Sequence, residues 1–220
     1  MEKRMIERIV PWTVNGESLP SFLCTPHALD ELAAGHLLTQ GQISDIREVR
    51  SIDVDGLSIR VATKHALRPV QTLEERLDAL RPVSPKRAFS LKDALSLMQA
   101  LMQVETYYGT HCLALQTPSV THFREDIGRH NALDKVIGRG ALDGVNFAAC
   151  AAAATGRISF EMLLKAASAG IPFIVSKKYP SDLSVEVANR LGICIVGNAL
   201  AASPVIYSAQ DLLEANASKN

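Results

Sequence analysis

The chain has few cysteines, and they are widely separated. Its 220 residues include four cysteines and no Cys-x-x-Cys pair. The cysteines are Cys24, Cys112, Cys150 and Cys194. Structural zinc sites and thioredoxin-type redox centres normally need closely spaced ligands or thiols. We therefore expect no metal bound directly by the protein and no dithiol catalyst, and isolated thiols are typical of a reducing cytosol.

The chain also lacks an excess of charge and a long apolar run. Its 23 lysines and arginines balance its 23 aspartates and glutamates. A net charge of zero argues against non-specific binding of a nucleic acid polymer. No apolar run is long enough to cross a membrane, and Met1-Glu2-Lys3-Arg4 lacks the apolar core of a signal peptide. We expect a cytoplasmic protein that contacts neither nucleic acid polymers nor a membrane.

The first part of the sequence is typical of a small α+β domain. Two β-hairpins are predicted, and both turn on an Asn-Gly or Asp-Gly pair, Asn15-Gly16 and Asp55-Gly56. Their strands are expected over residues 9–14, 19–23, 47–54 and 57–62. Between the hairpins, Thr25 is suited to cap a helix with Pro26 in its first turn, and Gly41 is suited to end it.

Residues 64–90 are the predicted domain junction, because prolines recur there. Thr72 and Glu75 have the spacing of a capping box for a short helix, and Ser90 is suited to cap a longer helix over 91–105. We therefore predict an N-terminal α+β domain over residues 1–85 and a C-terminal α/β domain over residues 86–220.

In the second part, apolar strands alternate with helices. Strands are predicted over residues 111–116, 120–124, 171–176 and 193–196. Helices are predicted over residues 130–137, 159–169 and 181–192. Residues 145–154 are ambiguous, since their alanines favour a helix while glycines bound the segment. The alternation indicates βαβ units on a parallel sheet.

Ligands of such sheets bind beyond the carboxyl ends of the strands. Basic side chains follow several predicted strands and could gather there with three helix N-termini: Arg124, Arg129, His130, Arg157, Lys177 and Lys178. That combination is suited to phosphate or pyrophosphate. The alternative is that Lys177 and Lys178 are only solvated, and that Asp126 and Asp134 cap a helix or pair with arginines.

The segment Asp126-Ile127-Gly128-Arg129-His130-Asn131 places four polar side chains around one glycine turn. Such convergence favours a functional site over a purely structural one. His111 and Cys112 are adjacent in a strand and point to opposite faces, so they do not form a nucleophile pair, and His111 alone is a candidate site residue.

Three motifs resemble the FdhD/NarQ sulfur carrier family of formate dehydrogenase accessory proteins. Residues 124–138 resemble its most distinctive motif, and residues 155–162, Thr-Gly-Arg-Ile-Ser-Phe-Glu-Met, resemble its second. Ala169-Gly170-Ile171-Pro172 with Ser176 after the strand resembles a third. Gly109-Thr110-His111 and the turn at Asn15-Gly16 also resemble the family, so the resemblance covers nearly the whole chain.

This resemblance implies a C-terminal three-layer α/β/α domain similar to the cytidine deaminases but without their zinc site. It makes residues 145–154 a strand. It also implies a homodimer that binds guanine nucleotides such as GDP. Family members receive persulfide sulfur from a cysteine desulfurase and pass it to the molybdenum bis-guanine-dinucleotide cofactor of a formate dehydrogenase, as a sulfur carrier or sulfurtransferase.

The chain departs from the family in two places. The family's Cys-x-x-Cys would fall near Pro69 and Thr72, which cannot form a persulfide. A family segment with two arginines is replaced by residues 198–203, which contain none. Either the chain binds the cofactor without transferring sulfur, as a cofactor-binding or regulatory paralogue, or Cys112 or Cys24 replaces the pair. A small-molecule enzyme of deaminase-like fold is the rival interpretation.

We expect three arginines, Arg124, Arg129 and Arg157, to contact phosphate. Three polar residues are expected to orient the ligand, namely Asp126, His130 and Asn131, and Asp134 is expected to hold an arginine in place. The remaining candidate cofactor-binding residues are His111, Lys177, Asn198 and Ser203. We assign no catalytic residue, and whether the chain is an enzyme stays open at this point.

Overall fold

The computed structural model describes residues 5–107 and 109–213. The first of its two sheets contains β1 (Arg8–Val14), β2 (Glu17–Cys24), β3 (Val49–Asp55) and β4 (Ser58–Thr63), in the order β2-β1-β4-β3. Both predicted hairpins are present, and Asn15 and Gly16 have the positive φ angles, 52° and 87°, that a type I′ turn requires. Parallel pairing of β1 with β4 joins the two hairpins into one sheet.

Helix α1 (Leu29–Thr39) packs against this sheet and begins later than predicted. Its N-cap residue is Ala28, with φ 51°, rather than Thr25. The hydroxyl of Thr25 is not available for capping, because it accepts a hydrogen bond of 3.1 Å from the backbone N–H of Ile127. The predicted cap is therefore wrong, and Thr25 instead connects the two parts of the chain.

The second sheet has six strands in the order β10-β9-β8-β7-β5-β6. They are β5 (His111–Gln116), β6 (Thr121–Asp126), β7 (Ala151–Ala154), β8 (Phe173–Ser176), β9 (Cys194–Gly197) and β10 (Val205–Ser208). Only β7, β8 and β9 are mutually parallel, so the prediction of a parallel sheet is confirmed for the centre and wrong for the rest. The short turn between β5 and β6 permits only an antiparallel pair, because a parallel pair needs a long crossover.

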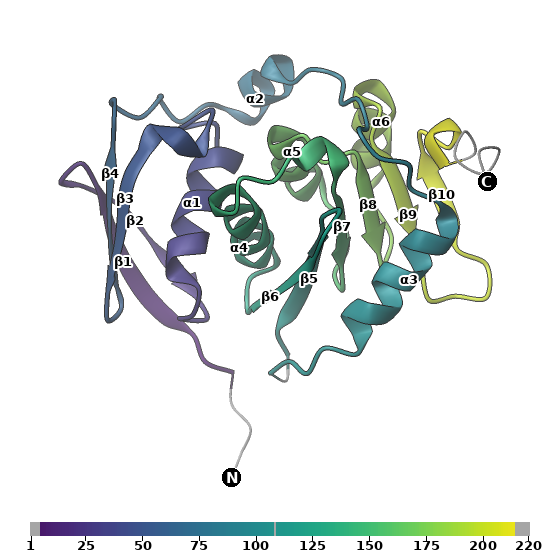
Figure 1. Cartoon of the computed structure of the whole chain (residues 1–220), viewed down its shortest axis with the longest axis horizontal. Helices are drawn as coiled ribbons and strands as arrows, with labels where there is room; N and C mark the ends of the chain where they lie inside the picture. Colours follow the sequence, from purple (N-terminus) through teal and green to yellow (C-terminus); the bar gives the residue numbers. More distant parts are fainter. Residues whose placement is uncertain (1–4, 108, 214–220) are drawn as a thin grey trace, which may run out of the picture.

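Helices cover both faces of this sheet, as Figure 1 shows. The helices that follow α1 are α2 (Leu73–Ala79), α3 (Leu91–Met102), α4 (Arg129–Leu142), α5 (Phe160–Ala169) and α6 (Asp182–Leu191). Short 3-10 turns η1 (Ile46–Glu48) and η2 (Phe147–Ala149) precede β3 and β7. Helices α4, α5 and α6 pack on one face and α3 packs on the other. The predicted three-layer α/β/α architecture is confirmed. Among the described residues, no helix has the length and apolar character to cross a membrane.

The alanine segment forms the strand that the family resemblance implied. In β7, Ala152 and Ala154 belong to the core beneath α4 and α5, while Ala151 and Ala153 belong to the core beneath α3. All four are buried. Small side chains on both faces let the two helical layers approach the sheet closely, so packing overrides the helical propensity of alanine.

Helix α4 is longer than the predicted range 130–137, because Gly138 does not end it. A Cβ atom on Gly138 would collide with the backbone of Glu31 in α1, and one on Gly35 would collide with the backbone of Asp134. The two glycines therefore let α1 and α4 cross at close range. In Figure 1, α1 lies between the first sheet and α4, and this crossing holds the two parts of the chain together.

Candidate functional site

The predicted convergence of loops at one edge of the second sheet is present. Strands β7, β8 and β9 are parallel and end at the same edge, and the antiparallel partner β5 begins there. The pairing of His111 with Asp126 brings the end of β6 to the same place. We call this edge the rim, and it comprises His111, residues 126–131, residues 155–157, Lys177 and Asn198.

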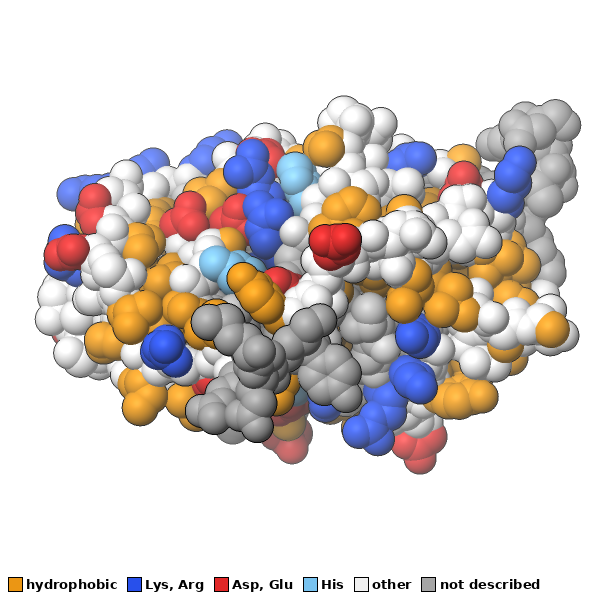
Figure 2. Space-filling model, turned by 90° about the horizontal axis from the view of Figure 1, so that it is seen from below, with side chains coloured by type: hydrophobic (Ala, Val, Ile, Leu, Met, Phe, Trp, Pro, Cys, Tyr) orange, Lys and Arg blue, Asp and Glu red, His pale blue; other side chains and the backbone are white. Residues whose placement is uncertain are grey.

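Hydrogen bonds connect the loops of the rim. The backbone N–H of Cys112 donates to Oγ1 of Thr155 over 3.1 Å, and Oγ of Ser176 donates to the carbonyl of Gly156 over 2.8 Å. The rim faces downward in Figure 1, and Figure 2 views the molecule from that side. Basic, acidic and histidine side chains lie close together in the middle of the face that Figure 2 shows.

Two helices begin at the rim without a side-chain cap. Helix α4 follows Gly128, whose own N–H donates to Oδ1 of Asp126 over 2.8 Å, and α5 follows Ser159, whose hydroxyl makes no cap hydrogen bond. Helix α6, by contrast, is capped by Ser181. First-turn N–H groups without a side-chain cap, together with the positive end of the helix dipole, are suited to an anion.

Three of the predicted basic residues lie at the rim. Arg129 is half-buried in the first turn of α4, next to Gly156, and its Nε is buried without a hydrogen-bond partner among the described residues. Arg157 is exposed in the loop after β7, and Lys177 is half-buried after β8. These cations come from different loops and lie where an anionic ligand could reach them.

The surroundings of the two rim histidines favour their neutral form. Burial, together with the nearby Arg129, lowers the pKa of His111. Burial, Arg129 and Lys165 lower the pKa of His130, although Glu161 opposes the effect with a carboxylate oxygen 3.5 Å from Nε2. A neutral imidazole can donate one hydrogen bond and accept another, so both side chains are suited to orient a polar ligand.

Asp126 has a structural role that the sequence did not reveal. It is fully buried, and Nζ of Lys135 donates to it over 2.6 Å. The backbone N–H of Thr25 also donates to it over 3.1 Å, and Nδ2 of Asn131 donates over 3.2 Å. Since Asn131 also donates to the carbonyl of Leu23, these groups fasten the N-terminal part to the start of α4.

Asp134 holds a lysine rather than the expected arginine. Nζ of Lys165 donates to both of its carboxylate oxygens over 2.8 and 2.7 Å, and Thr39 of α1 donates over 2.7 Å. Burial opposes ionisation, yet Lys165 and the hydrogen-bonded His36 hold the pKa of Asp134 at about 2. The expectation of an arginine partner is wrong, because Lys165 of the neighbouring helix α5 donates to both carboxylate oxygens of Asp134.

Arg124 does not face the rim either. Its Nε and Nη2 bind the carboxylate of Glu31 in α1, with Nη2 to Oε1 at 2.6 Å, and this pairing raises its pKa. Arg139 lies 3.9 Å from the same carboxylate. Arg124 therefore anchors α1 to the second sheet, which corrects its expected role in phosphate contact.

The last two candidates follow β9. Asn198 lies at the rim with φ 52°, and its N–H donates to the carbonyl of Lys178 over 3.0 Å. Ser203 lies in the exposed loop that leads to β10, beyond the segment at the rim. Sequence reasoning did not single out Lys135 and Lys165. They lie nine and thirty-one residues from their partners Asp126 and Asp134, so no local pattern indicates these pairs.

All four cysteines are buried. Burial, together with the nearby carboxylates of Asp126 and Glu125 respectively, raises the pKa of Cys24 and Cys112 to about 11. A persulfide carrier needs a reactive thiolate at an accessible position. Neither cysteine has these properties, so the structure does not favour a substitute thiol. Among the described residues, no group of three His, Cys, Asp or Glu side chains could hold a metal ion.

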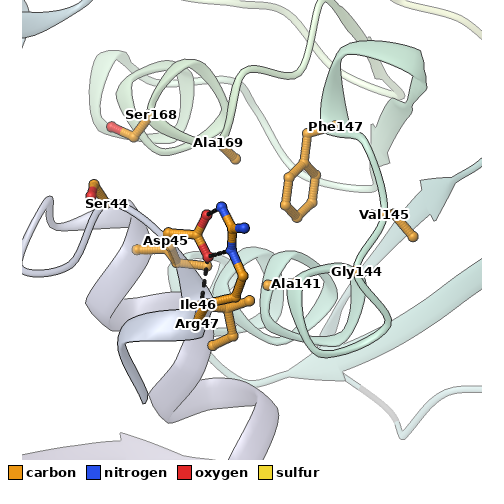
Figure 3. A pocket seen from close by; sticks show the side chains of 11 residues that line it. Ser44, Asp45, Ile46, Arg47, Ala141, Gly144, Val145, Phe147, Ser168 and Ala169 are labelled. Carbon is orange, nitrogen blue, oxygen red and sulfur yellow. Dashed lines mark hydrogen bonds and ion pairs between the residues drawn. The ribbon is translucent and has the colours of Figure 1, made fainter. Parts of the chain in front are cut away.

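A cavity of about 440 Å³ lies away from the rim, near the ends of α1, α4 and α5 (Figure 3). Phe147 and Val145 line it together with Arg47, as Figure 3 shows. The guanidinium of Arg47 is already paired with Asp45, with Nη2 to Oδ2 at 2.6 Å. Because its cation is satisfied internally, this cavity is a weaker candidate for an anionic ligand than the rim.

Comparisons with known proteins agree with these motifs. The model of the FdhD/NarQ family matches residues 5–214. The sulfur carrier protein FdhD of Bordetella bronchiseptica is 32% identical over 88% of this chain and 81% of its own length. The protein of the same name from Bacillus subtilis is 30% identical over 90% of this chain and 85% of its own length.

The fold is also found in a solved structure. A crystal structure assigned to a formate dehydrogenase accessory protein from Desulfotalea psychrophila superposes with a TM-score of 0.83 and 28% identity. It covers 94% of this chain and 89% of that one. Because the family model spans almost the whole chain and the curated relatives match over most of their length, the chain belongs to the FdhD/NarQ family.

Proposed function

We propose that this chain is an accessory protein of formate dehydrogenase maturation that binds the molybdenum bis-guanine-dinucleotide cofactor at the rim. The observation that carries the proposal is the meeting of two uncapped helix starts with Arg129, Arg157 and Lys177 at one sheet edge. Backbone N–H groups and guanidinium forks are the donors that phosphate groups prefer. The family membership supports the same ligand class.

Within this site, the first turns of α4 and α5 would receive phosphate oxygens. The neutral imidazoles of His111 and His130 would orient polar groups of the ligand. Asp126 and Asn131 would keep the start of α4 in position through their buried hydrogen bonds, without touching the ligand. The exposed Arg157 would bind an additional phosphate oxygen from the solvent side.

We further propose that the chain binds the cofactor without carrying sulfur itself. Pro69 and Thr72 are exposed at the positions where the family resemblance places a thiol pair, and the buried Cys24 and Cys112 have raised pKa values. Its role would be to hold or deliver the cofactor in the cytoplasm as a homodimer. A cysteine desulfurase and a formate dehydrogenase-type enzyme would be its partners.

Calorimetry with GDP tests the site. We expect micromolar binding, and we expect Arg157→Ala to weaken it about tenfold, equivalent to about 1.4 kcal/mol. The matched control is Lys178→Ala, which removes an exposed cation two residues after β8 and should change little. Absence of heat at millimolar GDP, or equal losses in both variants, would show that the rim is not the site.

Mass spectrometry after incubation with a cysteine desulfurase and labelled cysteine tests the absence of sulfur transfer. We expect no stoichiometric persulfide on the wild-type chain. The positive control is the double variant Pro69→Cys/Thr72→Cys, which places two exposed thiols in the connecting segment. A desulfurase-dependent persulfide on any native cysteine would contradict the proposal.

Light scattering on the same samples tests the proposed homodimer. A monomer mass at micromolar concentration would count against it.

A further inference from the structure

Arg76 in α2 is a buried cation without an acidic partner. Its side chain is 7% exposed, and no carboxylate among the described residues lies within ion-pair distance of it. Its Nη2 donates to the carbonyl of Thr39 over 2.7 Å, and its Nη1 donates to Oε1 of Gln40 over 3.1 Å. The Nε has no hydrogen-bond partner in the described part of the chain.

Neutral acceptors compensate a buried guanidinium only in part. The carbonyl of Thr39 belongs to the end of α1, where the helix dipole supplies a fraction of a negative charge. Buried charges in proteins are normally paired with a full opposite charge, because removal from water is costly. The hydrogen-bond acceptors of Arg76 therefore do not balance its full positive charge.

A cavity of about 320 Å³ lies beside Arg76. Its lining also includes Gln71, His130 and Lys165. The Nε2 of His130 is buried and, like Nε of Arg76, makes no hydrogen bond to a described residue. A water molecule occupies about 30 Å³ in the liquid, so the cavity has room for an ion of several atoms.

The acidic residues of this lining compensate Arg76 only in part, because burial lowers the pKa of Arg76 although Asp134 and Glu161 oppose the effect. Asp134 is occupied by Lys165 and His36, so this group carries little net charge towards the cavity. Glu161 lines the cavity as well, but its side chain is 54% exposed to water, which screens its charge. The buried part of the lining thus has a net positive charge that comes from Arg76.

We propose that this cavity is an anion-binding site for a phosphate-type oxyanion, held by Arg76 and His130. Such an ion supplies the paired negative charge that Arg76 lacks. It also offers an acceptor to two nitrogens that make no hydrogen bond to a described residue, although a Glu161 oxygen lies 3.5 Å from Nε2 of His130. The inference does not depend on nucleotide binding at the rim, although His130 belongs to the rim and also lines this cavity. The oxyanion is either free phosphate or the terminal phosphate of a larger ligand.

The probe is inorganic phosphate, titrated into full-length protein labelled with ¹⁵N-arginine and followed through the side-chain Nε–H resonances. We expect a saturable shift of the Arg76 resonance. In Arg76→Gln, calorimetry should show phosphate binding weakened about tenfold or more. The matched control is Arg68→Gln, an arginine of the same connecting segment that is paired with Glu48, and it should bind like the wild type.

The remaining outcomes separate this site from the rim. In Arg157→Ala, phosphate binding should persist while GDP binding weakens, and competition between GDP and phosphate in the wild type would identify the oxyanion as part of a nucleotide. Loss of phosphate binding in Arg157→Ala but not in Arg76→Gln would overturn the proposal. So would an Arg76 resonance in the wild type that does not respond to phosphate, a measurement that stays decisive if Arg76→Gln does not fold.

Discussion

The cations of the rim and the buried aspartates before and within α4 come from neighbouring stretches of sequence but have opposite surroundings. Asp126 and Asp134 are buried, and each binds a lysine and several further donors. At the rim, Arg129 and Arg157 have no acidic partner within ion-pair distance among the described residues. The comparison teaches that pairing distinguishes the structural charges from the charges that the proposed ligand would contact.

The largest effect is expected at the buried aspartates. Asp126→Ala would leave Lys135 buried and unpaired, which should lower the free energy of unfolding by about 3–5 kcal/mol. Urea denaturation followed by circular dichroism measures this value. The matched control is Asp53→Ala, which removes an exposed aspartate of β3 and should cost less than about 0.5 kcal/mol. Equal losses in both variants would contradict the structural role of Asp126.

The pH dependence of stability sharpens the comparison further. Because the pKa of Asp134 is about 2 in the folded chain and near 4 in an unfolded one, its ionised form stabilises the fold above about pH 4. That contribution, about 2–3 kcal/mol, is lost as the pH falls from about 4 through 2. In Asp134→Asn, the free energy of unfolding from urea denaturation should depend less on pH over this range than in the wild type. Parallel pH profiles in the variant and the wild type would refute this assignment.

A glycine substitution tests the close approach of the two helices. In an exposed helix, glycine to alanine is normally stabilising by about 1 kcal/mol. Gly138→Ala should instead destabilise by about 1–3 kcal/mol, because the added Cβ collides with the backbone of Glu31. Thermal unfolding gives the sign directly. A stabilised variant would mean that α1 and α4 are not in close contact in solution.

The smallest effect on stability is expected at the rim. Arg129→Ala removes a charge that makes no ion pair with a described residue, so the free energy of unfolding should change by less than about 1 kcal/mol. GDP affinity should nevertheless fall about tenfold. Denaturation and calorimetry on the same preparation measure the two quantities. A large loss of stability without a change in affinity would place Arg129 with the structural charges.

Local chemistry allowed much of the fold to be predicted. The turn at Asn15-Gly16 and the helix caps at Thr72 and Ser90 lie where the sequence indicated, because each depends on residues within four positions. The start of α1 could not be predicted, since Thr25 is held by Ile127 about a hundred positions away.

The candidate site shows the same division. Arg129 and Arg157 follow predicted strands and were expected at one edge, where the structure places them. His111 reaches this edge only because β5 is antiparallel to β7, which the predicted parallel sheet did not include. Arg124 was misassigned because nothing near it in the sequence reveals its partner Glu31. Long-range ion pairs depend on which helix covers which strand, and that is decided only when the whole chain is packed.

The crossing of α1 and α4 also has a consequence for synthesis on the ribosome. The first sheet is complete at Thr63, but the groove of α1 around Gly35 has no partner until α4 has left the exit tunnel. Contacts of such large sequence separation form late and leave apolar surface open in the meantime. Nascent chains that end before Arg129 should therefore be cut readily by protease within α1, and chains that extend well past Leu142 should be protected.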